Sequence, residues 1–237
     1  MRKSLKKREE LLEKHSNIAS MFKDFILGGQ DGLVNVLGIV LGVAIGTRNS
    51  DIVILAGLAA AFAESVSMGA VAYTSSKAEV DYYKSEEKRE LNEIKNSPET
   101  EKKEVYEIYH KKGFRGALLN KIVKYTISNK KRWLDTMMKE ELELSNKFSH
   151  PLRSAFIVLF ASLLGSFIPL TAFFFLSINT AIVVSLIIAA IALFITGAIE
   201  GKLTVGNWFK KGLQLMIIGM AAAFVGFIIG KFAGYSG

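Results

Sequence analysis

Residues 25–46 have the sequence FILGGQDGLVNVLGIVLGVAIG, in which Asp31 is the only charged residue. The stretch is long enough to cross a bilayer, because a membrane-spanning helix needs about 20 mostly apolar residues. A carboxylate in the hydrocarbon core costs about 2.5–3.5 kcal/mol, so it is tolerated mainly where it faces other helices or a water-filled path. The segment therefore predicts a transmembrane helix with one polar side.

Four further apolar stretches can also cross a bilayer: Ile52–Thr74, Arg153–Leu176, Thr180–Ile199 and Gly212–Gly230. Short turns join the first span to the second and the third to the fourth, which predicts two antiparallel hairpins. A long charged segment between the second and third spans has helical patterns and no strand-like alternation. We therefore predict an all-α integral membrane protein with five transmembrane helices and a helical insertion after the second.

The positive charges indicate the orientation. Residues 1–24 and 77–153 hold 25 of the 30 lysines and arginines. With the N-terminus in the cytoplasm, the inner side collects 28 of them and the outer side only Arg48 and Lys231. This asymmetry is the one that the positive-inside rule describes. We therefore expect an inside N-terminus and a C-terminus that is outside or lumenal.

This topology divides the chain into four predicted parts. They are a cytoplasmic basic N-terminal helix (1–24), transmembrane helices 1 and 2 (25–76), a cytoplasmic helical domain (77–152) and transmembrane helices 3 to 5 (153–237). No organelle address is recognisable, so the sequence leaves open a cell membrane, if the source is prokaryotic, or a vacuole-like membrane otherwise.

Several functional classes are excluded or disfavoured. The chain has no cysteine, so disulfides, thiol catalysis and cysteine-bound zinc are ruled out. It has no glycine-rich phosphate loop, nucleophile elbow or His-Glu-x-x-His zinc motif, so we expect neither an enzyme nor a required cofactor. The positive-inside rule explains the net charge of +8, and no aromatic–basic motif points to nucleic acid.

The acidic residues within the spans indicate a polar path. Glu64 lies near the middle of the second span, and Met68 follows one helical turn later on the same face. Asp31, in the first span, is followed one turn later by Asn35. Carboxylate and thioether together suit a transition-metal cation. A protonated structural contact at Glu64 and an interfacial position for Asp31 are the alternatives.

Side chains at helical spacing also mark the insertion. Three pairs place both members on one helix face, within reach of a shared ion: Glu90 with Glu93, Glu101 with Glu104, and Met137 with Glu141. Oxygen ligands alone would suit Mg²⁺, Ca²⁺ or Mn²⁺, and a thioether shifts the preference toward Fe²⁺. Lysines lie among these glutamates, so a solvated, salt-bridged helix is the alternative.

The motifs together resemble the vacuolar iron transporter family. The resemblance covers residues 23–234 and rests on the first span with its Asp-Gly-Leu-Val core, on AESVSMGAVAYTSSKAEVDYY (63–83) and RELNEI (89–94), and on SPETEKKEV (97–105), WLDTMMKEELEL (133–144) and GLQLMIIGMAAAFVGFIIG (212–230). It implies a homodimer that moves Fe²⁺, and often Mn²⁺, out of the cytosol in exchange for protons.

The resemblance also implies roles for individual residues. Asp31 and Met68 match the path residues of the family. The family's metal-binding domain uses two Glu pairs and a Met/Glu pair, which match Glu90, Glu93, Glu101, Glu104, Met137 and Glu141. One departure concerns the path glutamate, which eukaryotic members place eight residues before the methionine. This chain has Ala60 there, and Glu64 lies one turn further along.

The resulting hypothesis is a divalent-metal exporter in the lipid bilayer, in which Asp31, Glu64 and Met68 relay the ion and protons compete for Glu64. The position of Glu64, one turn after the position of the family's path glutamate, has three possible meanings. Glu64 takes over the role of that glutamate, or the ion selectivity is altered, or proton coupling is lost. Two alternative functions remain: a membrane-anchored metal buffer or sensor without transport, and a scaffold that binds no metal.

Overall fold

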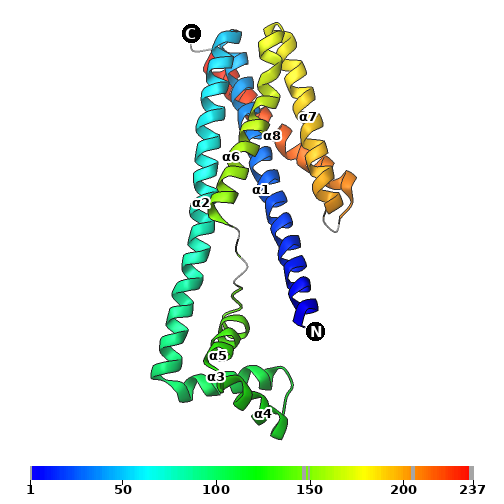
Figure 1. The fold of residues 1–237 in the computed structure, drawn as a ribbon. Helices are drawn as coiled ribbons and strands as arrows, with labels where there is room; N and C mark the ends of the chain where they lie inside the picture. The colour runs from blue at the N-terminus through cyan, green and yellow to red at the C-terminus, as the bar shows by residue number, and fades with distance from the viewer. Residues whose placement is uncertain (1, 146–147, 149, 204–205, 235–237) are drawn as a thin grey trace. The chain divides into compact units, whose positions relative to one another are not determined.

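The computed structural model describes the chain except for residues 1, 146–147, 149, 204–205 and 235–237, and it describes no side chains for residues 2–17 and 234. The described residues form helices and connecting turns, without a strand. The elements in chain order are α1 (Arg2–Thr47), α2 (Ser50–Asn96), α3 (Pro98–Lys111), α4 (Gly116–Ile127), α5 (Lys130–Thr136), the π-helix η1 (Met137–Glu141), α6 (Pro151–Phe175), α7 (Ile178–Leu203) and α8 (Trp208–Gly234) (Figure 1).

In the described part of the chain, five helices are long and apolar enough to cross a membrane. They are α1 from Ile18 onward, α2, α6, α7 and α8, and the shorter helices between α2 and α6 form the predicted insertion. The predicted fold class is therefore confirmed. The second predicted span is only the first half of α2, which continues without interruption into the insertion.

The chain divides into two compact units. Unit 1 consists of residues 1–73 and 149–237 and holds the spans; unit 2, residues 74–148, holds the second half of α2 with α3, α4, α5 and η1.

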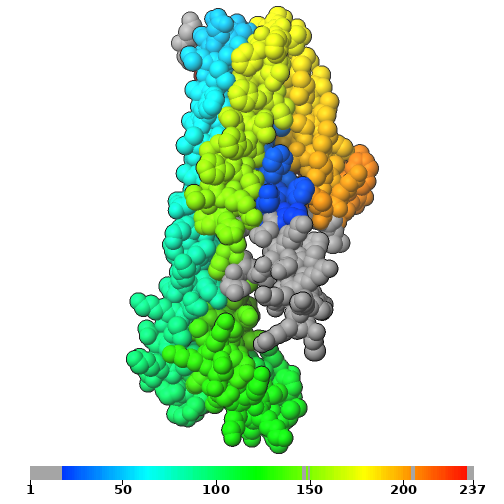
Figure 2. Space-filling model, in the orientation of Figure 1, coloured from blue at the N-terminus to red at the C-terminus, as the bar shows by residue number. Residues whose placement is uncertain are grey.

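Within unit 1, α1 packs most extensively against α6 and α8 and also contacts α7. On the face shown in Figure 2, only a small part of α1 is visible between α6 and α7. Glycine allows this close packing: a Cβ atom on Gly32 would lie 2.1 Å from the Ser162 carbonyl oxygen of α6. One on Gly230 of α8 would lie 2.1 Å from the Gly42 carbonyl oxygen of α1. Membrane helices associate through such small residues because lipid provides no hydrophobic driving force between them.

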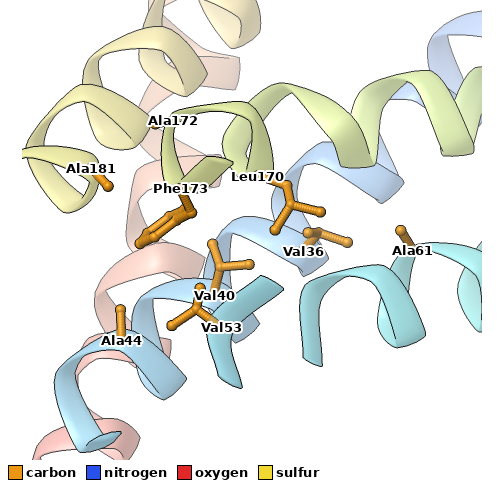
Figure 3. Close-up of a cluster of buried hydrophobic side chains, with 9 residues drawn as sticks. All are labelled: Val36, Val40, Ala44, Val53, Ala61, Leu170, Ala172, Phe173 and Ala181. Atoms are coloured by element: carbon orange, nitrogen blue, oxygen red, sulfur yellow. The ribbon is translucent and has the colours of Figure 1, made fainter. Parts of the chain in front are cut away.

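Apolar side chains from four helices fill one core of unit 1 (Figure 3). Val36 and Val40 of α1, Val53 of α2 and Leu170 of α6 are all completely buried there. The small-residue row of α2 faces α6 in antiparallel order: Gly57 lies against Leu170, and Gly69 against Leu159 and Ala155. This arrangement places the neighbouring row of α2, which carries Glu64, beside the contact with α6.

Two helix starts and a π-helix characterise unit 2. Ser97 occupies the N-cap of α3 before Pro98, but its side chain makes no capping hydrogen bond. Asn129 caps the start of α5, where its side chain accepts a hydrogen bond from the Arg132 amide. From Met137 the helix continues as the π-helix η1, which the sequence pattern did not predict. Met137, Met138 and Trp133 pack with Ile94 and Val105 in the core of this unit.

Candidate functional site

Two acidic side chains from different spans meet inside unit 1. Glu64 of α2 accepts a hydrogen bond from the side-chain nitrogen of Asn35 on α1. It also interacts with Asp31 of α1 through a side-chain hydrogen bond. Asp31 and Glu64 are both partly buried. The two carboxyl groups therefore lie close together between α1 and α2.

Met68 lies one turn after Glu64 on the same face of α2 and is also partly buried. Ala60, one turn before Glu64, has the same intermediate exposure. Glu64, and not residue 60, therefore provides the carboxylate that reaches α1. Asn35 was expected only as a polar neighbour of Asp31, and the tertiary contact identifies it as a hydrogen-bond donor to Glu64.

A groove of about 560 Å³ begins at Asn35 and follows α1 past Gly38 and Gly42 to Thr47. Residues of α8, among them Gly226 and Gly230, form its other wall. The groove exists because glycines on both helices leave space beside their contact. It runs from Asn35, the hydrogen-bond partner of Glu64, to the end of α1 at the turn to α2.

Five glutamates of unit 2 are close enough to influence one another electrostatically. They come from three elements, with one pair on α2, one pair on α3 and the last residue on η1: Glu90, Glu93, Glu101, Glu104 and Glu141. The folded insertion thus places all five carboxylates that the helical spacing had selected within electrostatic range of one another.

The environment favours the neutral form of three of these carboxyl groups, because burial raises the pKa of Glu90, Glu101 and Glu141. Burial, followed by the negative charges of Glu104, Glu90, Glu93 and Glu141, raises the pKa of Glu101 from 4.5 to about 7. The pKa of Glu141 rises to about 7 for the same reasons, although part of this residue is exposed to solvent. A bound cation would relieve both effects, because it supplies the missing positive charge.

The unused hydrogen-bonding capacity of the cluster fits a cation. Glu90 and Glu101 are only 1 % and 4 % exposed, yet one carboxylate oxygen of each is buried without a hydrogen-bond partner. Buried acceptors of this kind are costly unless something satisfies them. In the described residues, no three acidic or histidine side chains converge closely enough to hold an ion as they stand. A metal site here would have to close around its ion.

Met137 is completely buried in the apolar core of unit 2, and the exposed Glu141 ends the same π-helix. The role of Met137 as a thioether ligand stays a prediction. Arg89, which was not among the predicted site residues, forms ion pairs with Glu90 and Glu93. The signal was present, since Arg89 precedes Glu90 directly and Glu93 by one helical turn.

The fold and these residues define a polytopic helical membrane protein with acidic groups inside its spans and a separate acidic cluster in its insertion. The model of the VIT family matches residues 22–231. The chain is 35% identical to vacuolar iron transporter 1 of Arabidopsis thaliana over 221 residues, which cover 92% of this chain and 88% of that protein.

Two further relatives are also named vacuolar iron transporters and have a similar identity to the chain. Vacuolar iron transporter 1 of Tulipa gesneriana is 32% identical over 225 residues, or 94% of this chain and 91% of the relative. The vacuolar iron transporter of Plasmodium falciparum is 32% identical over 234 residues, or 92% and 86%. The chain belongs to the VIT family.

Proposed function

We propose that this protein transports divalent iron out of the cytoplasm, with Mn²⁺ as a second cargo, in exchange for protons. The observation that carries the proposal is the contact of Glu64 with Asp31 and Asn35 between two membrane-spanning helices. Charged groups inside spans are rare and usually mark an ion or proton pathway. The names of the relatives, all vacuolar iron transporters, supply the cargo.

The proposed coupling follows from chemistry at one carboxylate. Glu64 can hold a proton or ligate a metal ion, but the two compete because a metal ligand must be deprotonated. Asp31 and Met68 would complete the relay, and the groove from Asn35 to Thr47 offers an exit along α1. In line with the positive-inside rule, we propose that the N-terminus and unit 2 lie in the cytoplasm, where the glutamate cluster would collect the ion.

We also propose that the transporter is a homodimer. On α2, the small residues Ala59, Ala63 and Ser67 are exposed and recur every four residues. This spacing is typical of contacts between membrane helices. The row lies on the same helix as Glu64, so a partner subunit there would close the polar region from the lipid.

The test is anaerobic Fe²⁺ uptake into proteoliposomes, with and without an outward-directed proton gradient. We expect gradient-stimulated uptake by the wild type. The Glu64→Gln variant keeps the size of the side chain but removes its negative charge and its exchangeable proton, so uptake should fall at least about tenfold, which corresponds to about 1.4 kcal/mol in the transport barrier. Glu79→Gln is the matched control, because Glu79 is an exposed glutamate of unit 2 and should leave uptake unchanged.

A second candidate function is a membrane-anchored metal buffer. The specific observation in its favour is that all five clustered glutamates belong to unit 2, without a contribution from the spans. Metal binding without uptake above that of empty vesicles, by folded wild-type protein inserted in both orientations, would support the buffer and refute transport.

A further inference from the structure

Arg89 of α2 is surrounded by three carboxylates. Its Nη2 lies 3.0 Å from Oε2 of Glu86 and 3.2 Å from Oε1 of Glu90, and its Nε lies 3.8 Å from Oε2 of Glu93. The spacing on one helix explains the contacts, since Glu86 precedes Arg89 by three residues and Glu93 follows by four. A single guanidinium therefore spans three negative charges.

Two of these three partners belong to the proposed metal cluster, and the third does not. Glu90 and Glu93 are proposed ligands, whereas Glu86 stands one turn earlier on α2. The charge of Arg89 also acts on Glu141. The guanidinium thus supplies, in the metal-free protein, part of the positive charge that an ion would bring.

We propose that Arg89 is a built-in counter-ion of the metal cluster, which pairs with Glu90 and Glu93 in the metal-free protein and retreats to Glu86 when a divalent cation binds. The inference rests on the proposed metal binding by unit 2 and adds a residue that sets its affinity. Arg89 competes with the ion, so it weakens binding and keeps the ion exchangeable.

The side chains allow such a movement. The Arg89 side chain is 50% exposed, so its guanidinium can turn toward water without leaving a buried charge behind. The side chain of Glu90 is only 2% exposed and cannot follow it into solvent. An arginine stays charged at any physiological pH, so Arg89 does not give up the buried carboxylate by losing its own proton.

The competition also explains the open arrangement of the cluster. No three carboxylates of the described residues converge on one point, and Arg89 draws Glu90 and Glu93 toward itself. The unpartnered second oxygens of Glu90 and Glu101 then remain for the ion.

The test measures Mn²⁺ binding to the full-length protein in detergent micelles by titration calorimetry, with Mn²⁺ chosen because it resists oxidation. We expect Arg89→Gln to lower the dissociation constant of the unit 2 site about three- to tenfold, in line with the loss of partly screened charge repulsion. Lys88→Gln is the matched control: it removes the same charge from the neighbouring, exposed position and should change affinity little. Arg89→Lys, which keeps the charge but lacks the planar fork, should lie between wild type and Arg89→Gln.

A second readout separates competition from structural support. Without metal, Arg89→Gln should lower the melting temperature, because the carboxylates then repel one another unscreened; the rise in melting temperature on adding Mn²⁺ should exceed that of the wild type. An arginine that only stabilised the fold would lower stability and weaken binding together.

Two outcomes overturn the inference in distinguishable ways. If the wild type binds Mn²⁺ and Arg89→Gln binds it equally or more weakly, Arg89 does not compete, and the proposed metal cluster stands. If the Glu101→Gln variant binds Mn²⁺ as tightly as the wild type does, the glutamate cluster is not the binding site. The proposed metal binding by unit 2 and the proposed role of Arg89 then both fail.

Discussion

At the scale of single residues, the buried carboxyl group of Glu101 connects the stability of the insertion with metal binding. Its pKa is about 7 in the folded protein, against an ordinary value of 4.5. A carboxyl group whose pKa rises on folding favours the folded state while it is protonated. That contribution is fully present below about pH 4.5 and is lost as the pH rises through about 7.

The first prediction is that metal-free unit 2 melts at a higher temperature at pH 5.5 than at pH 8, and that saturating Mn²⁺ stabilises it more at pH 8, where protons no longer compete. The chain has two tryptophans, and Trp133 lies in the core of unit 2. Its fluorescence in a Trp208→Phe background therefore reports the melting of this unit alone.

Glu101→Gln provides the decisive variant for this prediction. Glutamine resembles the protonated form, so metal-free stability at pH 8 should rise and its dependence on pH should weaken, while Mn²⁺ affinity falls. If the Glu101→Gln variant melts at a lower temperature than the wild type at pH 8, burial of the charged Glu101 carboxylate does not destabilise the folded protein, and the prediction is wrong.

At the scale of whole elements, the contact between α1 and α8 depends on glycines in unequal ways. A Cβ atom added to Gly226 of α8 would lie 2.2 Å from the Gly38 carbonyl oxygen, and backbone cannot move aside easily. A Cβ atom on Gly38 itself would meet nothing closer than the Ala222 carbonyl oxygen at 3.7 Å, an ordinary contact. Both residues lie in the same interface, but only at Gly226 is there no room for a side chain.

We therefore predict that Gly226→Ala destabilises the protein by about 1–3 kcal/mol, the usual cost of overpacking, whereas Gly38→Ala is tolerated. Thermal unfolding in detergent, followed by size-exclusion chromatography, compares the two. Equal tolerance of both variants would show that α8 can shift away from α1. Because both glycines line the groove that starts at Asn35, uptake assays of the folded variants would also test its part in transport.

At the scale of the whole molecule, the proposed dimer places α2 against its copy. The chain contains no cysteine, so a single introduced cysteine reports one contact. We predict that Ala63→Cys forms a disulfide-linked dimer on mild oxidation in membranes, because two cysteines bridge when their Cα atoms lie within about 7 Å.

Ile187→Cys, on the exposed side of α7, is the control and should stay monomeric on gels. Crosslinking through residue 187 but not residue 63 would move the interface to α7 and refute the dimer contact proposed for α2.

The sequence by itself determined the features that depend on local periodicity and hydropathy. The five spans follow from apolar length, and the glutamate pairs of the insertion follow from helical spacing, which places residues three and four apart on one face whatever the surroundings. The ion pairs of Arg89 with Glu86 and Glu93 belong to the same class, since they too lie within one helix.

Only the tertiary structure decided which of these faces meet. Glu64 contacts Asp31 and Asn35 across two helices, and Glu101 lies within electrostatic range of Glu90 and Glu141 from two other elements. Such contacts depend on how distant segments pack, and so does the burial that raises the pKa of Glu101. The π-helix at Met137 was not predictable from the sequence either. It is only five residues long, and so short a change from α-helical to π-helical hydrogen bonding leaves no periodic pattern in the sequence. The sequence thus determined the type and spacing of the acidic residues, while the packing of the helices decided which of them lie close together and which are buried from water.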